Sequence, residues 1–205
     1  MDTIANKQDI QKLIREHTVF SFIHSTYGPP PEMKRPPGFV SLSKIILEQQ
    51  VSLASARAHF ERLKAYVPEF KPAYLLKLTD QEMRKCHISK QKASYLRSLS
   101  SSIINGELDL KGLWELDEPE IRRQLTQIKG IGNWTADVYL MFCLQSKDIF
   151  PIGDIAIIHT VKELTAAQSK EEISALSEHW RPLRSLASFF LWHYYLRKRN
   201  RPLLL

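Results

Sequence analysis

A glycine-containing turn and a later aspartate are the parts of this sequence best suited to chemistry. Gly130 and Gly132 lie within residues 125–136, which read Leu-Thr-Gln-Ile-Lys-Gly-Ile-Gly-Asn-Trp-Thr-Ala, and Asp154 follows Trp134 by twenty residues. Glycine lets the backbone turn tightly and approach another molecule without a Cβ between them. A helix that starts after this turn would point unpaired amide groups outward, and such amides bind anions. The turn therefore predicts an anion site, and Asp154 offers a carboxylate that could react.

The segment 118–145 predicts two helices joined by this turn. Gly-x-Gly alone would fit a corner between helices that merely needs two glycines. The longer pattern Leu-x-x-Ile-x-Gly-Ile-Gly-x-x-Thr-Ala is typical of the helix–hairpin–helix element, which holds DNA phosphates and positions a duplex without reading its sequence. The residues expected to make these contacts are Lys129, Gly130, Ile131, Gly132, Asn133 and Thr135.

The charge of the chain fits a polyanionic partner. It contains 29 lysines and arginines against 22 aspartates and glutamates, which gives a formal net charge of +7. A basic enzyme that never meets nucleic acid could have the same balance, so charge alone leaves both alternatives open.

Cysteine content and hydropathy limit the cofactors and the compartment. Cys86 and Cys143 are the only cysteines, too few for an all-cysteine zinc site or an iron–sulfur cluster. The histidines show no metal-ligand spacing, so we expect no catalytic metal and no required cofactor. Two cysteines also make no disulfide framework, which favours a reducing compartment, the cytoplasm or, in a eukaryote, the nucleus. We find no signal peptide and no apolar run approaching about 18 residues, so we expect no membrane segment.

Helical spacing and capping signals recur along the chain, without sustained apolar–polar alternation. We therefore predict an all-α protein with nine or ten helices and no sheet. The helices are expected near 7–17, 39–50, 52–67, from 79, 89–105, from 117, 133–145, from 169, and from 182 to about 201. Proline-rich residues 27–31 and 36–38 predict loops.

Several stretches, taken with the hairpin and Asp154, resemble the helix–hairpin–helix (HhH-GPD) DNA glycosylase superfamily, specifically its 3-methyladenine DNA glycosylase II (AlkA-like) branch. Residues 39–52 resemble the early Gln-Gln helix of that branch, residues 88–96 its DNA-probing turn, and residues 180–185 the start of its last helix. The likeness covers about 20–197, nearly the whole chain.

The resemblance implies that residues 1–205 form a single unit of two helical lobes with a DNA-binding cleft between them. One lobe would comprise about 35–115, and the other the N-terminal helix with about 116–205. The additional N-terminal β-rich domain that some members carry is not expected here.

The resemblance also implies a monofunctional, monomeric glycosylase that removes alkylated purines such as 3-methyladenine from damaged double-stranded DNA. Members that also cut the backbone usually carry a lysine nucleophile where this chain has Trp134, and Lys129 would serve phosphate instead. Asp154 would either stabilise oxocarbenium-like charge or deprotonate the attacking water. An aspartate after glycine is also a common helix cap, which is the alternative for Asp154 taken alone.

A flipped-out base needs a pocket, and aromatic rings favour a cationic base through stacking and cation–π attraction. Trp134 is the first candidate for this pocket, followed by Tyr27, Tyr139 and Trp180, and Gln50 would give polar support. Ordinary core packing is the alternative for the aromatic residues, and helix capping is the alternative for Gln50.

The gap left by a flipped base would be filled from the turn at Ser89 and Lys90, although the small Ser89 makes a poor wedge. A basic stretch around this turn would face DNA, unless it is simply a solvated surface. Its members are Arg84, Lys85, His87, Lys92 and Arg97.

The resemblance further implies a structural Na⁺ or K⁺ held by hairpin carbonyls, at Thr126, Ile128 and Ile131. Two other functions remain open from the sequence. One is a non-catalytic helix–hairpin–helix DNA-binding module, which would need neither Asp154 nor the Gln-Gln helix. The other is a glycosylase for a different lesion, such as uracil, hypoxanthine or oxidised guanine.

Overall fold

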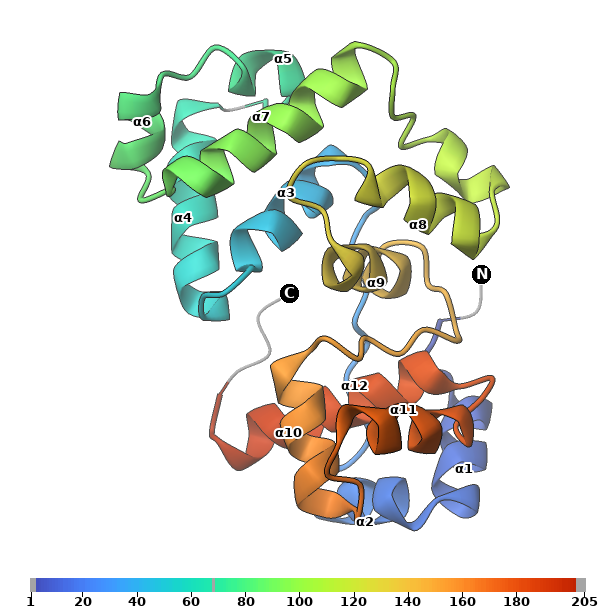
Figure 1. The fold of residues 1–205 in the computed structure, drawn as a ribbon. Coiled ribbons are helices and arrows are strands. Elements are labelled where there is room, and N and C mark those ends of the chain that lie inside the picture. The colour runs from blue at the N-terminus through green and yellow to red at the C-terminus, as the bar shows by residue number, and fades with distance from the viewer. Residues whose placement is uncertain (1–2, 68, 202–205) are drawn as a thin grey trace. The chain divides into compact units, whose positions relative to one another are not determined.

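The computed structural model describes residues 3–67 and 69–201, and within them it is built of helices without β-strands (Figure 1). The all-α prediction is therefore confirmed. The helices are α1 (Lys7–Glu16), α2 (Thr18–Tyr27), α3 (Phe39–Glu48), α4 (Leu53–Tyr66), α5 (Pro72–Leu75), α6 (Asp80–Lys85), α7 (Lys90–Ile104), the 3₁₀ helix η1 (Gly112–Glu115), α8 (Glu118–Thr126), α9 (Asn133–Phe142), α10 (Ile155–Leu164), α11 (Lys170–Glu178) and α12 (Arg184–Lys198). None of these helices is long and apolar enough to cross a membrane.

The predicted capping residues begin their helices. Side-chain oxygens of Ser52, Ser89 and Asp117 accept the backbone amide three residues later. Thr79 and Ser169 form complete capping boxes with a glutamate at the third helical position. Each cap satisfies an amide that the helix itself leaves without a partner.

Several elements differ from the prediction. Helices α2 and α5 and the 3₁₀ helix η1 were not expected, and α12 begins at Arg184 rather than at Pro182. The sequence of α2 is rich in aromatic and β-branched residues, which have modest helix propensity. Burial of Phe20 and Ile23 stabilises this helix instead.

The chain forms two compact units. One contains the residues up to Lys34 and those from Leu140 on, and the other is Arg35–Tyr139. Residues 116–139 were expected to lie with the N-terminal helix, whereas the structure groups them with residues 35–115. The contacts of the hairpin described below account for this grouping.

In the unit that contains α1, α2, α10 and α11, α12 is the central helix. It packs against α1, α2 and α10, and its residues Ser185–Leu191 are all buried. In the Arg35–Tyr139 unit, α3 packs against α4 and α7, and α7 also contacts α5 and α6 (Figure 1). Ser41, Leu42, Ser43, Ile45, Ile46 and Leu47 of α3 are all buried.

Candidate active site and nucleic-acid interface

The hairpin between α8 and α9 is a tight turn anchored by isoleucines. The Ile131 amide donates to the Ile128 carbonyl at 3.0 Å, and both side chains are buried. Gly130 between them has a φ of +94°, the left-handed region that favours glycine. The outer side of the turn is different, since Lys129, Gly132 and Asn133 are exposed. The predicted phosphate-binding residues at these three positions are therefore accessible.

A second constraint makes Gly130 necessary. A Cβ built on this residue would lie 2.1 Å from Cγ of Tyr95, a residue of α7. The Tyr95 hydroxyl accepts a hydrogen bond from Nε2 of Gln91 at 2.7 Å. The hairpin thus lies directly on the Tyr95 ring, a contact that the sequence analysis did not anticipate.

Gln49, at the end of α3, fixes the hairpin from another direction. Its Nε2 donates to the Gly130 carbonyl and to the Thr135 hydroxyl, both at 2.9 Å. Thr135 is buried, so its side chain supports the turn and does not face a phosphate. Gln50, the predicted pocket residue, is exposed and has a φ of +56°. The hairpin contact of the Gln-Gln pair therefore belongs to Gln49 and not to Gln50.

Replacing Gln49 by alanine should lower the free energy of unfolding by about 1–3 kcal/mol, because the Gly130 carbonyl and the Thr135 hydroxyl both lose their donor. Chemical denaturation would measure this loss. Gln50→Ala is the matched control and should stay within about 0.5 kcal/mol of the parent protein. Equal losses in the two variants would contradict the role of Gln49.

The two helices of the hairpin element are also joined by an ion pair. Arg122 of α8 lies 2.6 Å from Asp137 of α9, whose side chain is only 9% exposed. Burial raises the pKa of the Asp137 carboxyl, and Arg122 opposes that rise. This pair joins α8 to α9, whereas Gln49 and Tyr95 join the hairpin to α3 and α7 of the Arg35–Tyr139 unit.

Asp154 is the N-cap of α10. Its Oδ1 accepts the amides of Ala156 and Ile157 at 2.9 and 3.0 Å, and the residue is half-buried. The capping interpretation is thus correct, and it does not exclude chemistry, because two amides hold the carboxylate in a fixed orientation. Ile155, the next residue, is 81% exposed, so the start of α10 is open to solvent.

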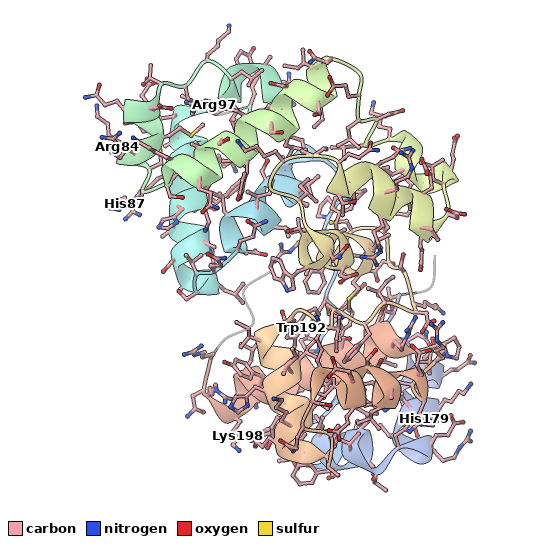
Figure 2. All side chains as sticks on the ribbon, in the orientation of Figure 1. Arg84, His87, Arg97, His179, Trp192 and Lys198 are labelled. Carbon is pink, nitrogen blue, oxygen red and sulfur yellow. The ribbon has the colours of Figure 1, made fainter. Side chains whose placement is uncertain are left out.

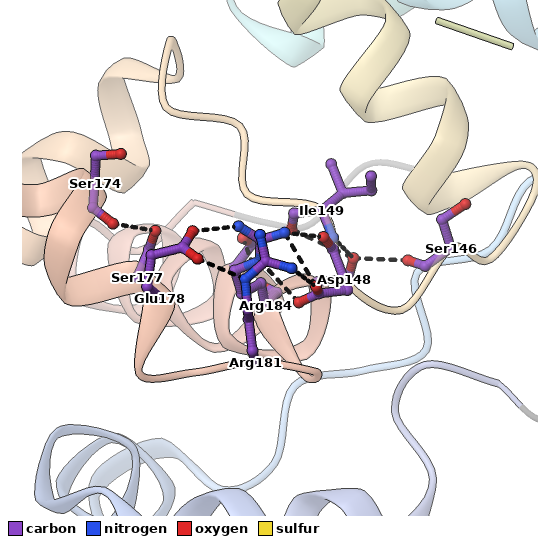
Figure 3. A network of polar contacts seen from close by, with 10 residues as sticks. Ser146, Asp148, Ile149, Ser174, Ser177, Glu178, Arg181 and Arg184 are labelled. Carbon is purple, nitrogen blue, oxygen red and sulfur yellow. Dashed lines mark hydrogen bonds and ion pairs between the residues drawn. The ribbon is translucent and has the colours of Figure 1, made fainter. Parts of the chain in front are cut away.

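The loop that leads to Asp154 is tied to the start of α12 (Figure 3). Arg184 donates from Nε to Oδ1 of Asp148 and from Nη2 to the Asp148 carbonyl, both at 2.8 Å. The buried Ser185 hydroxyl donates to the Ser146 carbonyl at 2.6 Å and accepts the Ile149 amide at 2.9 Å. The position of Asp154 is therefore set by α12 as well as by its own helix.

The predicted aromatic pocket residues have different environments. Trp134, the second residue of α9, is half-buried. Tyr139 is fully buried and its hydroxyl accepts the Gly38 amide at 3.0 Å. Trp180 is 2% exposed, with its ring edge-on to Phe20 at 5.1 Å. Burial favours the packing alternative for Tyr139 and Trp180.

Tyr27, the remaining aromatic candidate, lies beside the rings of His193 and Tyr194 on α12. Tyr27 is half-buried, and its carbonyl lies 3.1 Å from Nε2 of His193. Trp192 of α12, labelled in Figure 2, was not singled out from the sequence. It is partly exposed and packs against Phe142 and Phe189. The signal in the sequence was a tryptophan directly after the apolar run of the last helix.

The turn before α7 is exposed at Ser89 and Lys90, and Ser89 caps that helix. Of the basic stretch around it, two members are engaged within the protein. Arg97 pairs with Asp80 at 2.6 Å, and Lys92 donates to the Leu47 carbonyl at 2.6 Å. These two contacts stabilise the unit, and contact of Arg97 and Lys92 with DNA stays a prediction.

The other members of that basic stretch lie on the surface. Arg84, Lys85 and His87 are exposed, and Figure 2 shows Arg84 and His87 near the end of α6. They remain candidates for contact with a polyanion.

The carbonyls predicted to hold a monovalent ion lie at the end of α8 and in the turn. That of Ile128 already accepts the Ile131 amide, and a carbonyl oxygen has a second lone pair for a cation. The ion remains a prediction. Over residues 3–67 and 69–201, no three histidine, cysteine, aspartate or glutamate side chains gather as metal ligands would.

The sequence matches the model of the HhH-GPD superfamily of base excision DNA repair proteins over residues 43–182. It is 32% identical over 162 residues to the putative DNA-3-methyladenine glycosylase YfjP of Bacillus subtilis, covering 74% of this chain and 56% of that protein. It is 30% identical over 173 residues to DNA-3-methyladenine glycosylase 1 of Schizosaccharomyces pombe, covering 81% and 76%. The chain thus spans little more than half of the Bacillus relative.

Solved structures show the same fold. The crystal structure of a DNA-3-methyladenine glycosidase from Bacillus halodurans superposes with a TM-score of 0.77 at 26% identity, covering 97% of this chain and 94% of that one. The S. pombe 3-methyladenine DNA glycosylase Mag1, in complex with abasic DNA, superposes with a TM-score of 0.81 at 26% identity, covering 91% and 95%.

Proposed function

Because the chain belongs to the HhH-GPD superfamily of base excision DNA repair proteins, we propose that it hydrolyses the N-glycosidic bond of alkylated purines such as 3-methyladenine in duplex DNA. The observation that carries this proposal is the Asp154 carboxylate, which two amides hold at an exposed helix start. A protein that only bound DNA would need a cap at this position, which a neutral asparagine or serine also provides, but not the negative charge. The names of the similar glycosylases support the same substrate class.

In the proposed reaction the damaged nucleotide leaves the base stack, since its glycosidic bond is inaccessible within the duplex. The bond between C1′ and the base nitrogen breaks, and the base takes the bonding electrons. Asp154 stabilises the positive charge that develops on the sugar or accepts a proton from the water that attacks C1′. The products are a free base and an abasic site, which starts base excision repair.

Lesion selection follows from the charge of the base. Alkylation at N3 leaves adenine with a positive charge, so it departs without further protonation. Trp134, which is half-buried at the start of α9, would stack on such a base with cation–π attraction of about 0.5–2 kcal/mol. The hairpin amides near Gly130 and Gly132 would hold the DNA backbone without sequence preference.

The direct test is to incubate the protein with methylated duplex DNA and to identify the released bases by chromatography. We expect free 3-methyladenine, with abasic sites left in the strand. Duplex binding without any released base would favour the non-catalytic module. Release of uracil, hypoxanthine or oxidised guanine from matched substrates, but of no methylated purine, would indicate a glycosylase for another lesion.

The proposed mechanism is monofunctional, because Trp134 provides no amine to attack the sugar. Borohydride treatment during turnover should therefore trap no covalent protein–DNA adduct, and strand breaks should appear only after alkali. The parent protein and Lys129→Ala should behave alike in this assay. A strong adduct in both would mean that another lysine acts as nucleophile.

A further inference from the structure

Basic side chains from three neighbouring elements gather beside the turn that precedes α7. We define this histidine cluster as His59 and Arg62 of α4, His87 of the turn, and Lys92 of α7. The rings of His59 and His87 are parallel within 3°, with their centroids 6.1 Å apart. The cluster lies wholly within the Arg35–Tyr139 unit.

The charges that act on His59 are all positive. Burial lowers the pKa of His59 first, and Lys92, His87 and Arg62 each lower it further. No carboxylate contributes to this balance. Glu48 raises the pKa of Lys92, and it already pairs with Arg35 at 2.8 Å. Positive charges held close together repel one another, and a bound anion would offset this repulsion.

The backbone presents one of the imidazoles in an unusual conformation. His87 has a φ of +62°, which is uncommon for a residue with a Cβ, and its side chain is exposed. Such conformations persist where the surrounding structure holds them, and they are enriched at ligand sites. Figure 2 shows His87 beside the end of α6, close to Arg84.

We propose that His59, Arg62 and His87 form a phosphodiester-binding site that takes up protons when the DNA backbone binds. The site is separate from the hairpin and deepens the proposed function, on which it rests. Lys92 adds charge rather than a direct contact, since its ammonium donates to the Leu47 carbonyl. A phosphate beside the His59 imidazole favours its protonated form, so DNA affinity should rise as the pH falls.

Fluorescence anisotropy with an undamaged duplex, at pH 6 and pH 8 and constant ionic strength, tests this inference. We expect the parent protein to bind about fivefold to tenfold more tightly at pH 6, which corresponds to an average uptake of about half a proton or slightly less over these two pH units. The double variant His59→Gln/His87→Asn should lose most of that difference, and asparagine also tolerates the left-handed backbone at position 87. His179→Gln removes an exposed histidine of the other unit and should retain the difference.

A second readout does not depend on any variant. The pKa of the His59 imidazole, followed by NMR in the parent protein, should rise when the undamaged duplex is added. An unchanged pKa, or an unchanged pH dependence in the double variant, would overturn the inference while base release from methylated DNA still supported the proposed function. Absence of duplex binding at both pH values, together with no base release, would overturn both.

Discussion

Asp154→Asn is expected to lower the rate of base release by about two to four orders of magnitude, the usual loss when a positioned acid–base or electrostatic group is removed. Asparagine keeps an oxygen that can accept the Ala156 and Ile157 amides, and it is a favourable N-cap. The substitution thus removes the negative charge and the proton acceptor but not the helix cap. Single-turnover release of 3-methyladenine is the measurement.

Asp117→Asn is the matched control, because Asp117 caps α8 in the same way through the Glu120 amide at 2.9 Å. This variant should leave the rate of base release unchanged within about twofold, because asparagine caps a helix about as well as aspartate does. Affinity for undamaged duplex should stay within a few-fold of the parent in both variants. If Asp154→Asn kept more than about a tenth of the parent rate, Asp154 would not hold the catalytic role.

Gly130→Ala is expected to cause the largest loss of stability of any single methyl addition to the hairpin. Two costs combine at this residue. A non-glycine residue at a φ of +94° costs about 1–2 kcal/mol. The new Cβ must also displace the Tyr95 ring from 2.1 Å, and such overpacking costs about 1–3 kcal/mol. The free energy of unfolding should fall by the sum, about 2–5 kcal/mol, as measured by chemical denaturation.

Two further variants separate these costs. Gly106 has a φ of +76° but no atom within 4 Å of its missing Cβ, so Gly106→Ala should report the backbone cost alone. Adding Tyr95→Ala to Gly130→Ala removes the clash, so the double variant should lose less than the sum of its single substitutions. An equal loss in Gly106→Ala and Gly130→Ala would show that Tyr95 does not constrain the hairpin.

Local signals in the sequence predicted most of the helices. Ser52, Thr79, Ser89, Asp117 and Ser169 each act within their own first helical turn, so their function can be recognised from neighbouring residues. Helix α2 lacked such a signal, since His17 makes no side-chain cap and its apolar residues are stabilised by packing. Propensity and capping therefore predict the helices that carry their own capping residues. The other helices are stabilised by burial in the tertiary structure, which local sequence does not show.

The side-chain partners of the hairpin could not be predicted in the same way. Gln49 lies 81 residues before Gly130, and nothing in the spacing of Gln49 and Gln50 indicates which of them faces inward. That choice depends on the end of α3, where Gln50 takes a φ of +56° and turns outward. The grouping of the hairpin with residues 35–115 could not be predicted for the same reason, because the hairpin joins its unit through contacts distant in sequence.

The attachment of residues 146–149 to Arg184 and Ser185 has a consequence for how this protein can change over evolution. Surface loops usually accept insertions and deletions, because few contacts depend on their length. Here one added or removed residue between Ser146 and Asp154 would shift the carboxylate or break the bonds to the start of α12. This loop should therefore keep its length among related sequences, while the residues that make no such bonds are free to vary.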